Sequence, residues 1–171
     1  MPFHKQVSAW LDCLHQSLRQ AAWAPLLVVG IHFVAMRLHV YHRYPAFDIP
    51  MHFFGGLAMA FFLHRTAIQA SSAAVIGPYH PVTHRLLVFI MTCTVAVFWE
   101  FSEFIADHIT GSFSQLGLDD TLGDLLFGTL GAGFFIILVV LLERHTSISA
   151  GRLSPKSPAL TTAAPEDLPR G

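Results

Sequence analysis

The sequence predicts an all-α membrane protein: a bundle of four transmembrane helices, with an amphipathic interfacial helix before it and a disordered tail after it. Hydrophobic residues make up 53% of the 171 residues and charged residues only 12%, and the mean hydropathy is +0.54. Four apolar stretches are each close to the roughly 20 residues that cross about 30 Å of hydrocarbon. The predicted parts are residues 1–20, 21–143 and 144–171.

The N-terminal part has the pattern of a helix that lies in the membrane interface. Trp10, Leu11, Leu14 and Leu18 recur at helical spacing between polar residues. A cleavable signal is not expected, because no short apolar core with a small-residue cleavage site is present there. Residues 1–20 are therefore predicted to form an amphipathic helix.

The transmembrane part is predicted to contain four helices. Their expected ranges are 21–41, 49–70, 86–107 and 120–142. Pro50 suits the first turn of the second helix, because the N–H group that proline lacks would have no helical partner there. After Arg144 the chain is rich in Ser, Pro, Thr, Ala and Gly, which have little to bury, and this predicts a disordered tail.

The net charge makes nucleic acid an unexpected partner, and the distribution of Lys and Arg predicts the orientation of the chain in the membrane. The net charge is −1 and no basic cluster is present, so nucleic acid is not an expected partner. With both termini in the cytoplasm, Arg37 and Arg43 would be the only Lys or Arg outside, against eight inside. We therefore predict a multi-pass protein of the cell inner (plasma) membrane with both termini cytoplasmic. Cys13 and Cys93 lack metal-site spacing and are expected to be unpaired thiols.

Acidic side chains collect at the same ends of three predicted spans, together with one histidine. An ionisable group at membrane depth costs roughly 2.5–3.5 kcal/mol on insertion scales, so a functional site is the default hypothesis. With these ends on one side, the orientation above places the site near the outer face. The residues are Asp48, His52, Glu100, Glu103, Asp107, Asp120 and Asp124.

Helical spacing brings these groups onto shared faces. Glu100, Glu103 and Asp107 fall within one narrow arc of a helix, while Asp48 and His52, like Asp120 and Asp124, are four residues apart. Small residues on the same helices allow close approach in lipid, which favours inward-facing stripes. The small residues are Gly55, Gly56, Gly128 and Gly131.

Carboxylates and an imidazole on facing helices predict a divalent metal site. Helical bundles build metal sites in this way, and the ligand types suit Mg, Mn, Zn or iron. The pattern D-x-x-x-H, E-x-x-E-x-x-x-D, D-x-x-x-D matches neither the zincin nor the di-iron motif, so it does not identify the metal. Either Glu103 or Asp124 could serve as a catalytic general base. The predicted ligands are Asp48, His52, Glu100, Glu103, Asp120 and Asp124.

Simpler structural roles compete with ligation at several of these positions. Asp48 and Asp120 begin helices, so each could cap free N–H groups, and Asp107 could be a solvated residue at the interface. Glu100 does not fit this interpretation, because it is about 21 Å into its predicted span. If no cation is bound, close carboxylates are expected to share protons.

Three blocks of sequence give the chain a resemblance to a known group. They are DIPMHFFGG from Asp48, WEFSEF from Trp99 and DDTLGDLLFGTLGA from Asp119. These blocks resemble VanZ-like membrane proteins and the related YjdF-type family of unknown function. The resemblance covers about half the chain. It implies the same architecture and the importance of Asp48, His52, Glu100, Glu103, Asp120 and Asp124, but no reaction.

This chain also departs from VanZ patterns in two places. It has Gly-Leu-Asp-Asp rather than an Arg-containing approach to the last span, and Phe127-Gly128 where Asn-Gly is common. Antibiotic resistance is therefore not carried over to it.

Three hypotheses for function follow. The first is a metal-dependent membrane enzyme that acts on a lipid or a lipid-linked phosphate, with Arg37 and Arg43 near the anionic head group. The second is a non-catalytic protein in which the carboxylates bind a cation or protons. The third is a scaffold of a membrane complex, in which the acidic groups only pair helices. The sequence indicates neither a substrate nor an oligomeric state.

Overall fold

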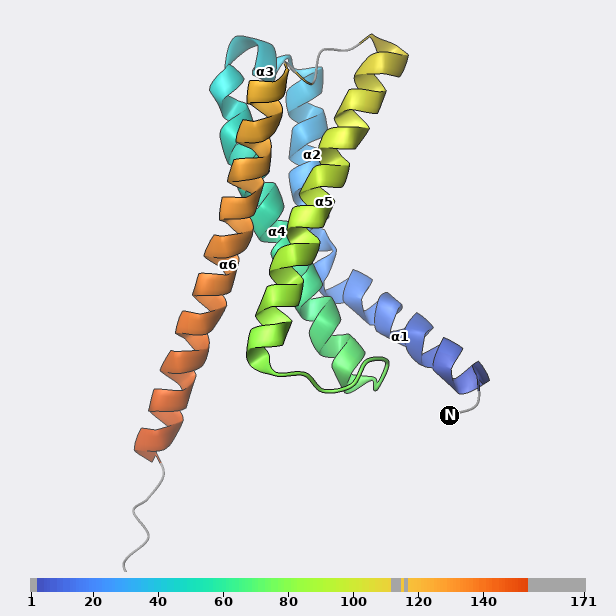
Figure 1. Cartoon of the computed structure of the whole chain (residues 1–171), viewed down its shortest axis with the longest axis vertical. Coiled ribbons are helices and arrows are strands. Elements are labelled where there is room, and N and C mark those ends of the chain that lie inside the picture. Colours follow the sequence, from blue (N-terminus) through green and yellow to red (C-terminus); the bar gives the residue numbers. More distant parts are fainter. Residues whose placement is uncertain (1–2, 112–114, 116, 154–171) are drawn as a thin grey trace, which may run out of the picture. The chain divides into compact units, whose positions relative to one another are not determined.

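The structure is a computed structural model that describes residues 3–111, 115 and 117–153, all of whose regular elements are helical. The chain divides into two compact units, Met1–Val139 and Val140–Gly171, and every contact described below lies within the first. The predicted all-α fold is confirmed (Figure 1). The elements are α1 (Phe3–Ala21), α2 (Trp23–Arg37), α3 (Val40–Arg43), the 3₁₀ turn η1 (Pro45–Phe47), α4 (Asp48–Ser72), α5 (Pro81–Thr110) and α6 (Leu118–Leu153).

Three helical segments are long and apolar enough to cross a membrane. They are Pro45–Ser72, Pro81–Thr110 and Leu118–His145, and they contain the predicted spans 49–70, 86–107 and 120–142. Helix α6 continues to Leu153, so residues 144–153 of the predicted tail are helical. The rest of that tail, residues 154–171, lies outside the described residues.

The first predicted span, 21–41, differs from a single straight helix. Helices α1 and α2 are bent by 56° at their junction, and they supply a fourth span only if this bent pair counts as one. Pro25 lies in the first turn of α2 and has no N–H to donate to the preceding turn, which explains the break. At the other end, α2 stops at Arg37, and His39 adopts a left-handed backbone with φ of 57°.

Helix α1 is amphipathic, as predicted, and its polar side is attached to α4. The buried Ser17 hydroxyl lies 2.9 Å from Gln69 Oε1, and Gln69 Nε2 donates to Gln20 Oε1 at 2.8 Å. Arg65 donates to the same Gln20 oxygen at 2.9 Å. The apolar side chains of α1 are exposed; they include Val7, Trp10, Leu11, Leu14 and Leu18.

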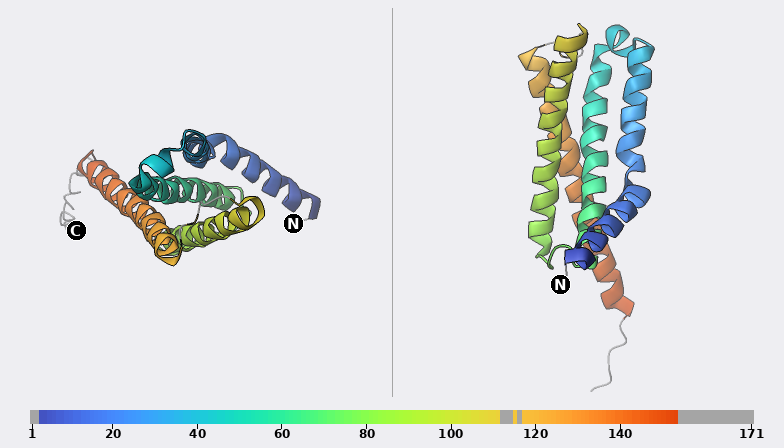
Figure 2. Two further views of the ribbon diagram at one scale, coloured as in Figure 1. Left: turned by 90° about the horizontal axis from the view of Figure 1, so that it is seen from above. Right: turned by 90° about the vertical axis from the view of Figure 1, so that its right-hand side faces the viewer.

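Helix α4 lies between α2 and α5, and α6 packs closely against it (Figure 2). A Cβ atom at Gly56 would overlap the backbone of Gly128, and one at Gly131 would overlap the carbonyl of Phe53. The helices therefore approach each other where only glycine fits. This crossing places the first turns of α4 and α6 beside each other.

A small apolar core holds these helices together one to three turns further along. Ala60, Val88, Ala132 and Phe135 form its buried centre. Most large apolar side chains on α4, α5 and α6 are exposed instead, including Phe54, Phe98 and Leu126. Apolar surface on this scale is expected of helices that face lipid.

Candidate metal centre

The first part of the site is the initial turn of α4. Asp48 is the first residue of this helix and His52 follows one turn later, so Asp48 Oδ1 lies 3.3 Å from His52 Nε2. The N-cap residue is Phe47, whose side chain makes no capping hydrogen bond. The contact that the structure gives the Asp48 carboxylate is with the imidazole rather than with a helix N-terminus.

Helices α5 and α6 each add a buried carboxylate to this imidazole. Asp124 Oδ1 lies 3.5 Å from His52 Nε2, and Glu100 Oε1 lies 3.8 Å from His52 Nδ1. Glu100 is 5% exposed and Asp124 is 6% exposed. Groups from three helices that are far apart in the sequence therefore meet at one histidine.

Glu103 completes the cluster and connects it to an aromatic group. One ligand atom each from His52, Glu100 and Glu103 lie within 4.8 Å of one another, and the same holds for Asp48, His52 and Asp124. The Trp99 indole N–H donates to Glu103 Oε1 at 2.9 Å. This bond orients Glu103 from one helical turn away on α5.

Two of the acidic residues singled out in the sequence lie outside both groups of three. Asp120, a predicted ligand, is half-buried one turn before Asp124 on α6 and joins neither group. Asp107 accepts a hydrogen bond from the Gln115 backbone N–H at 2.8 Å, which ties the end of α5 to the following loop. The compact cluster is therefore Asp48, His52, Glu100, Glu103 and Asp124.

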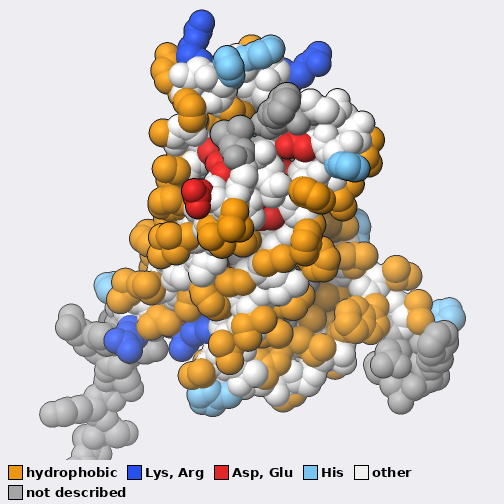
Figure 3. Space-filling view, turned by 45° about the horizontal axis from the view of Figure 1, so that its top comes forward, with side chains coloured by type: hydrophobic (Ala, Val, Ile, Leu, Met, Phe, Trp, Pro, Cys, Tyr) orange, Lys and Arg blue, Asp and Glu red, His pale blue; other side chains and the backbone are white. Residues whose placement is uncertain are grey.

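The charge of the cluster is not balanced by protein cations. No Lys or Arg side chain of the described residues lies within ion-pair distance of Asp48, Glu100, Glu103 or Asp124. His52 is the ion-pair partner of Asp48, Glu100 and Asp124. One oxygen of Glu100, Oε2, is buried without a hydrogen-bond partner. A buried charged group without a partner is strongly unfavourable, so the cluster requires a cation or protons. In Figure 3 the acidic side chains lie between apolar ones, apart from the Lys and Arg side chains.

The two nitrogens of His52 cannot both act as metal ligands while the ring is neutral, because one of them carries a proton. Two atoms bound at 2.0–2.2 Å to one ion can be at most about 4.4 Å apart. The separations of 3.3 and 3.5 Å at Nε2 fit this limit. Nδ1 then carries the proton on the side of Glu100, whose Oε1 lies 3.8 Å away, longer than a hydrogen bond. A carboxylate on this side is the usual orienting partner of a metal-bound histidine.

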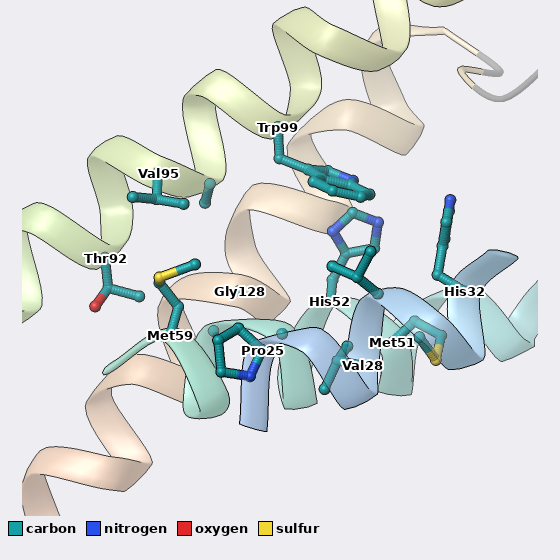
Figure 4. A pocket seen from close by; sticks show the side chains of 14 residues that line it. Pro25, Val28, His32, Met51, His52, Met59, Thr92, Val95, Trp99 and Gly128 are labelled. Atoms are coloured by element: carbon teal, nitrogen blue, oxygen red, sulfur yellow. The ribbon is translucent and has the colours of Figure 1, made fainter. Parts of the chain in front are cut away.

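An apolar pocket of about 110 Å³ adjoins the cluster. His52 is a member of the cluster and also lines the pocket. Figure 4 shows the Trp99 indole over the His52 imidazole at one end of the pocket. The pocket runs between α2, α4 and α5, and Gly128 of α6 also lines it. The remaining walls are mainly apolar, and they include Pro25, Val28, Met59 and Val95.

The sequence interpretation did not single out several residues that surround the site. His32 lines the pocket, hydrogen-bonds the Tyr41 hydroxyl at 2.8 Å, and meets the Trp99 ring edge-on at 5.3 Å. Histidine and tryptophan within apolar spans were the available signal, and Trp99 also stands four residues before Glu103, one helical turn away. Their role depends on the packing of α2 against the other helices, which no local pattern encodes.

A second polar group joins α4, the following loop and α5. His64 Nδ1 and His84 Nε2 are 2.8 Å apart, and His84 Nδ1 is 3.3 Å from the Tyr79 hydroxyl. Tyr79 donates to the Ala67 carbonyl at 2.8 Å, so its oxygen accepts from His84 Nδ1–H. In neutral rings His64 Nδ1–H then donates to His84 Nε2. Burial also raises the pKa of Tyr79.

Comparisons with known proteins address the family. Residues 16–145 match the family described as "Predicted membrane protein (DUF2238)". The chain belongs to this family. An uncharacterised protein of Thermotoga maritima is 31% identical over 97 residues, a segment that covers 55% of this chain and 47% of that relative. This chain thus spans about half the length of the relative, and no solved structure matches it significantly.

The family assignment establishes a membrane protein with several apolar helices. The narrower resemblance to VanZ-like and YjdF-type proteins stays a prediction.

Proposed function

We propose that this protein binds one divalent metal ion through His52 Nε2 and the carboxylates of Asp48 and Asp124. The observation that carries the proposal is the charge balance. Four clustered carboxylates face one imidazole, without Lys or Arg among the described neighbours, and one oxygen of the buried Glu100 has no hydrogen-bond partner. A mixed imidazole and carboxylate set suits Mn, Fe or Zn, and the carboxylates also suit Mg.

The ion would act as a Lewis acid on a lipid or a lipid-linked phosphate. A bound divalent metal polarises a phosphoryl or carbonyl oxygen and can supply hydroxide at neutral pH. Asp124 is used as a ligand in this arrangement, so the general base is Glu103, which Trp99 holds in place. Support for a membrane substrate comes from the position of the cluster near the ends of apolar helices and from the apolar pocket beside it.

The location and orientation that we propose follow from the charges of the loops. Both termini lie in the cytoplasm, the protein is in the plasma membrane, and the metal site opens toward the outer face. Arg37 and Arg43 are exposed close to the same ends of the helices, where they could attract an anionic head group.

Elemental analysis tests the metal. Protein purified in detergent is analysed for Mg, Mn, Fe and Zn, beside Asp124→Asn and His52→Ala. Asp119→Asn is the matched control, because Asp119 is exposed on the same helix as Asp124. We expect close to one ion per chain in the wild type and in Asp119→Asn, and a loss in both site variants. Wild-type protein without metal, including after incubation with each ion, would overturn the proposal.

Turnover tests the enzymatic part separately. Metal-loaded protein is incubated with phospholipids and isoprenoid phosphates in mixed micelles, and products are followed by mass spectrometry. Glu103→Gln should keep the metal but lose roughly 10²–10⁴-fold in rate, the usual contribution of a general base. A variant that turns over as fast as the wild type would exclude Glu103 from this role.

The alternative is a non-catalytic protein that binds protons or a cation. The partnerless Glu100 oxygen favours it, because a protonated carboxyl group is far cheaper to bury than a carboxylate. In that case the metal-free wild type should show the infrared carbonyl band of a protonated acid, and Glu100→Gln should remove the band. Stoichiometric metal without such a band would exclude the alternative.

A further inference from the structure

The pocket beside the cluster has a polar end and an apolar end. At the polar end, His52 presents its imidazole both to the carboxylates and to the pocket, under the Trp99 ring (Figure 4). At the other end lie Met59, seven residues after His52 on α4, and Thr92, seven residues before Trp99 on α5. Seven residues correspond to roughly 10 Å of helical rise. A ligand that complements this space is polar at one end and apolar along its length.

The volume of the pocket limits what enters it. An engineered apolar cavity of roughly 150 Å³ stays dry and accepts one benzene molecule. The pocket here measures about 110 Å³. It therefore suits a few methylene groups rather than a whole lipid, and its apolar walls disfavour ordered water.

We propose that this pocket binds the first methylene groups of the hydrocarbon chain of an anionic amphiphile whose phosphate head group lies at the carboxylate and histidine cluster. The assignment of the head group rests on the proposed metal site, whereas the assignment of the chain rests on the pocket. The rest of the chain would continue into the surrounding lipid. Selectivity for a hydrocarbon chain attached to phosphate then comes from the polar cluster and the apolar pocket lying side by side.

Gly55 lines the pocket and offers room for a larger side chain there. A Cβ atom there would meet only Val28 Cγ1, at 4.0 Å, so a larger side chain would extend into the pocket. The neighbouring Gly56 is different, because its Cβ would overlap the Gly128 backbone. Gly30 offers a matched control: it is an exposed helical glycine, and a Cβ there would meet nothing within 4 Å.

The test measures binding as a function of chain length. Alkyl phosphates from methyl to octyl are titrated against wild-type protein, Gly55→Leu and Gly30→Leu in detergent, with and without the metal found by elemental analysis. Burial of one methylene group is worth about 0.8 kcal/mol, which corresponds to roughly a fourfold change in affinity. The wild type and Gly30→Leu should gain about this factor per carbon for the first few carbons and then level off.

Gly55→Leu should keep its metal and its affinity for methyl phosphate but lose the gain with chain length. The same gain in Gly55→Leu as in Gly30→Leu would overturn the chain site, because partition into micelles affects both variants alike. Binding that rises with chain length but ignores metal would leave the chain site intact and refute the placement of the phosphate at the metal, while elemental analysis alone decides whether the metal site exists. A wild type without any dependence on chain length would refute the chain site, whatever its metal content.

Discussion

A single methyl group at Gly56 should separate the two sides of the metal centre. The Cβ of a Gly56→Ala variant would overlap the Gly128 backbone, and Gly128 itself faces the carbonyl oxygen of His52. Two helix backbones cannot yield as a flexible side chain does, so α4 and α6 must move apart. A shift of about 1 Å, the scale at which misplacement already impairs reactive sites, would widen the 3.5 Å separation of His52 Nε2 and Asp124 Oδ1. The pair would then exceed the roughly 4.4 Å that two ligands of one ion can span.

We therefore expect Gly56→Ala to weaken metal binding by roughly 10–100-fold, as disturbed support of a ligand does, and to lower stability by about 1–3 kcal/mol through overpacking. Metal titration and thermal unfolding in the same detergent measure the two effects. Gly30→Ala is the control, because the added methyl meets nothing and alanine favours a helix by roughly 0.5–1 kcal/mol over glycine. If Gly56→Ala binds metal and unfolds like Gly30→Ala, the inferred close crossing of α4 and α6 does not control the site.

Four further results are expected. Glu100→Gln should weaken metal binding by roughly 10–100-fold, because Glu100 orients His52 instead of binding the ion. The loss should be smaller than that of Asp124→Asn. Equal losses of the two variants in a metal titration would indicate that Glu100 is itself a ligand. Chelation should lower the unfolding temperature of the wild type but not of Asp124→Asn, since an ion at 100 times its Kd stabilises the folded protein by about 2.7 kcal/mol. Equal shifts in unfolding temperature for the two proteins would show that the ion does not bind at Asp124. Ser17→Ala should lower the unfolding free energy by about 0.5–1.5 kcal/mol, because the buried hydroxyl contacts Gln69 across the α1–α4 junction; an unchanged unfolding temperature would show that this contact adds nothing. Because burial raises the pKa of Tyr79, this tyrosine ionises first in the unfolded state, so stability should fall as pH rises above about 10. Tyr79→Phe should therefore show a smaller fall in unfolding temperature than the wild type between about pH 9 and 11. An equal fall in both proteins would refute a contribution of Tyr79 to the pH dependence.

The fold was largely predictable because lipid imposes a simple rule on the chain. Spans of about 20 apolar residues must be helical to satisfy their backbone groups, and α4, α5 and α6 contain the whole of their predicted ranges. The sequence predicted separate helices for residues 1–20 and 21–41, with Pro25 near the start of the second, but not that α2 would end at Arg37. A proline near the start of an apolar run fits either a first turn or a kink, and the packing of α1 on α4 decides between them.

The convergence of the site was predictable from phase along each helix, but its membership was not. Spacing of four residues placed Asp48 with His52, and the alternation of span directions placed both near Glu100 and Asp124. The same spacing predicted Asp120 beside Asp124, yet Asp120 lies outside both groups of possible ligands. Both residues lie on one face of α6, so it is their position along the helix axis that distinguishes Asp124, beside His52, from Asp120, one turn earlier.

The glycines and the carboxylates thus depend on each other. Charged groups are tolerated within a membrane protein only when partners replace the water that they lose, and here the partners must come from another helix because each helix supplies only part of the set. Glycine at positions 56 and 131 brings the backbones of α4 and α6 close enough for His52 to reach Asp124. A larger residue at either position would push the helices apart and separate Asp124 from its imidazole partner, which adds to the cost of overpacking. The small residues are therefore as much a part of the candidate site as the side chains that carry its charge.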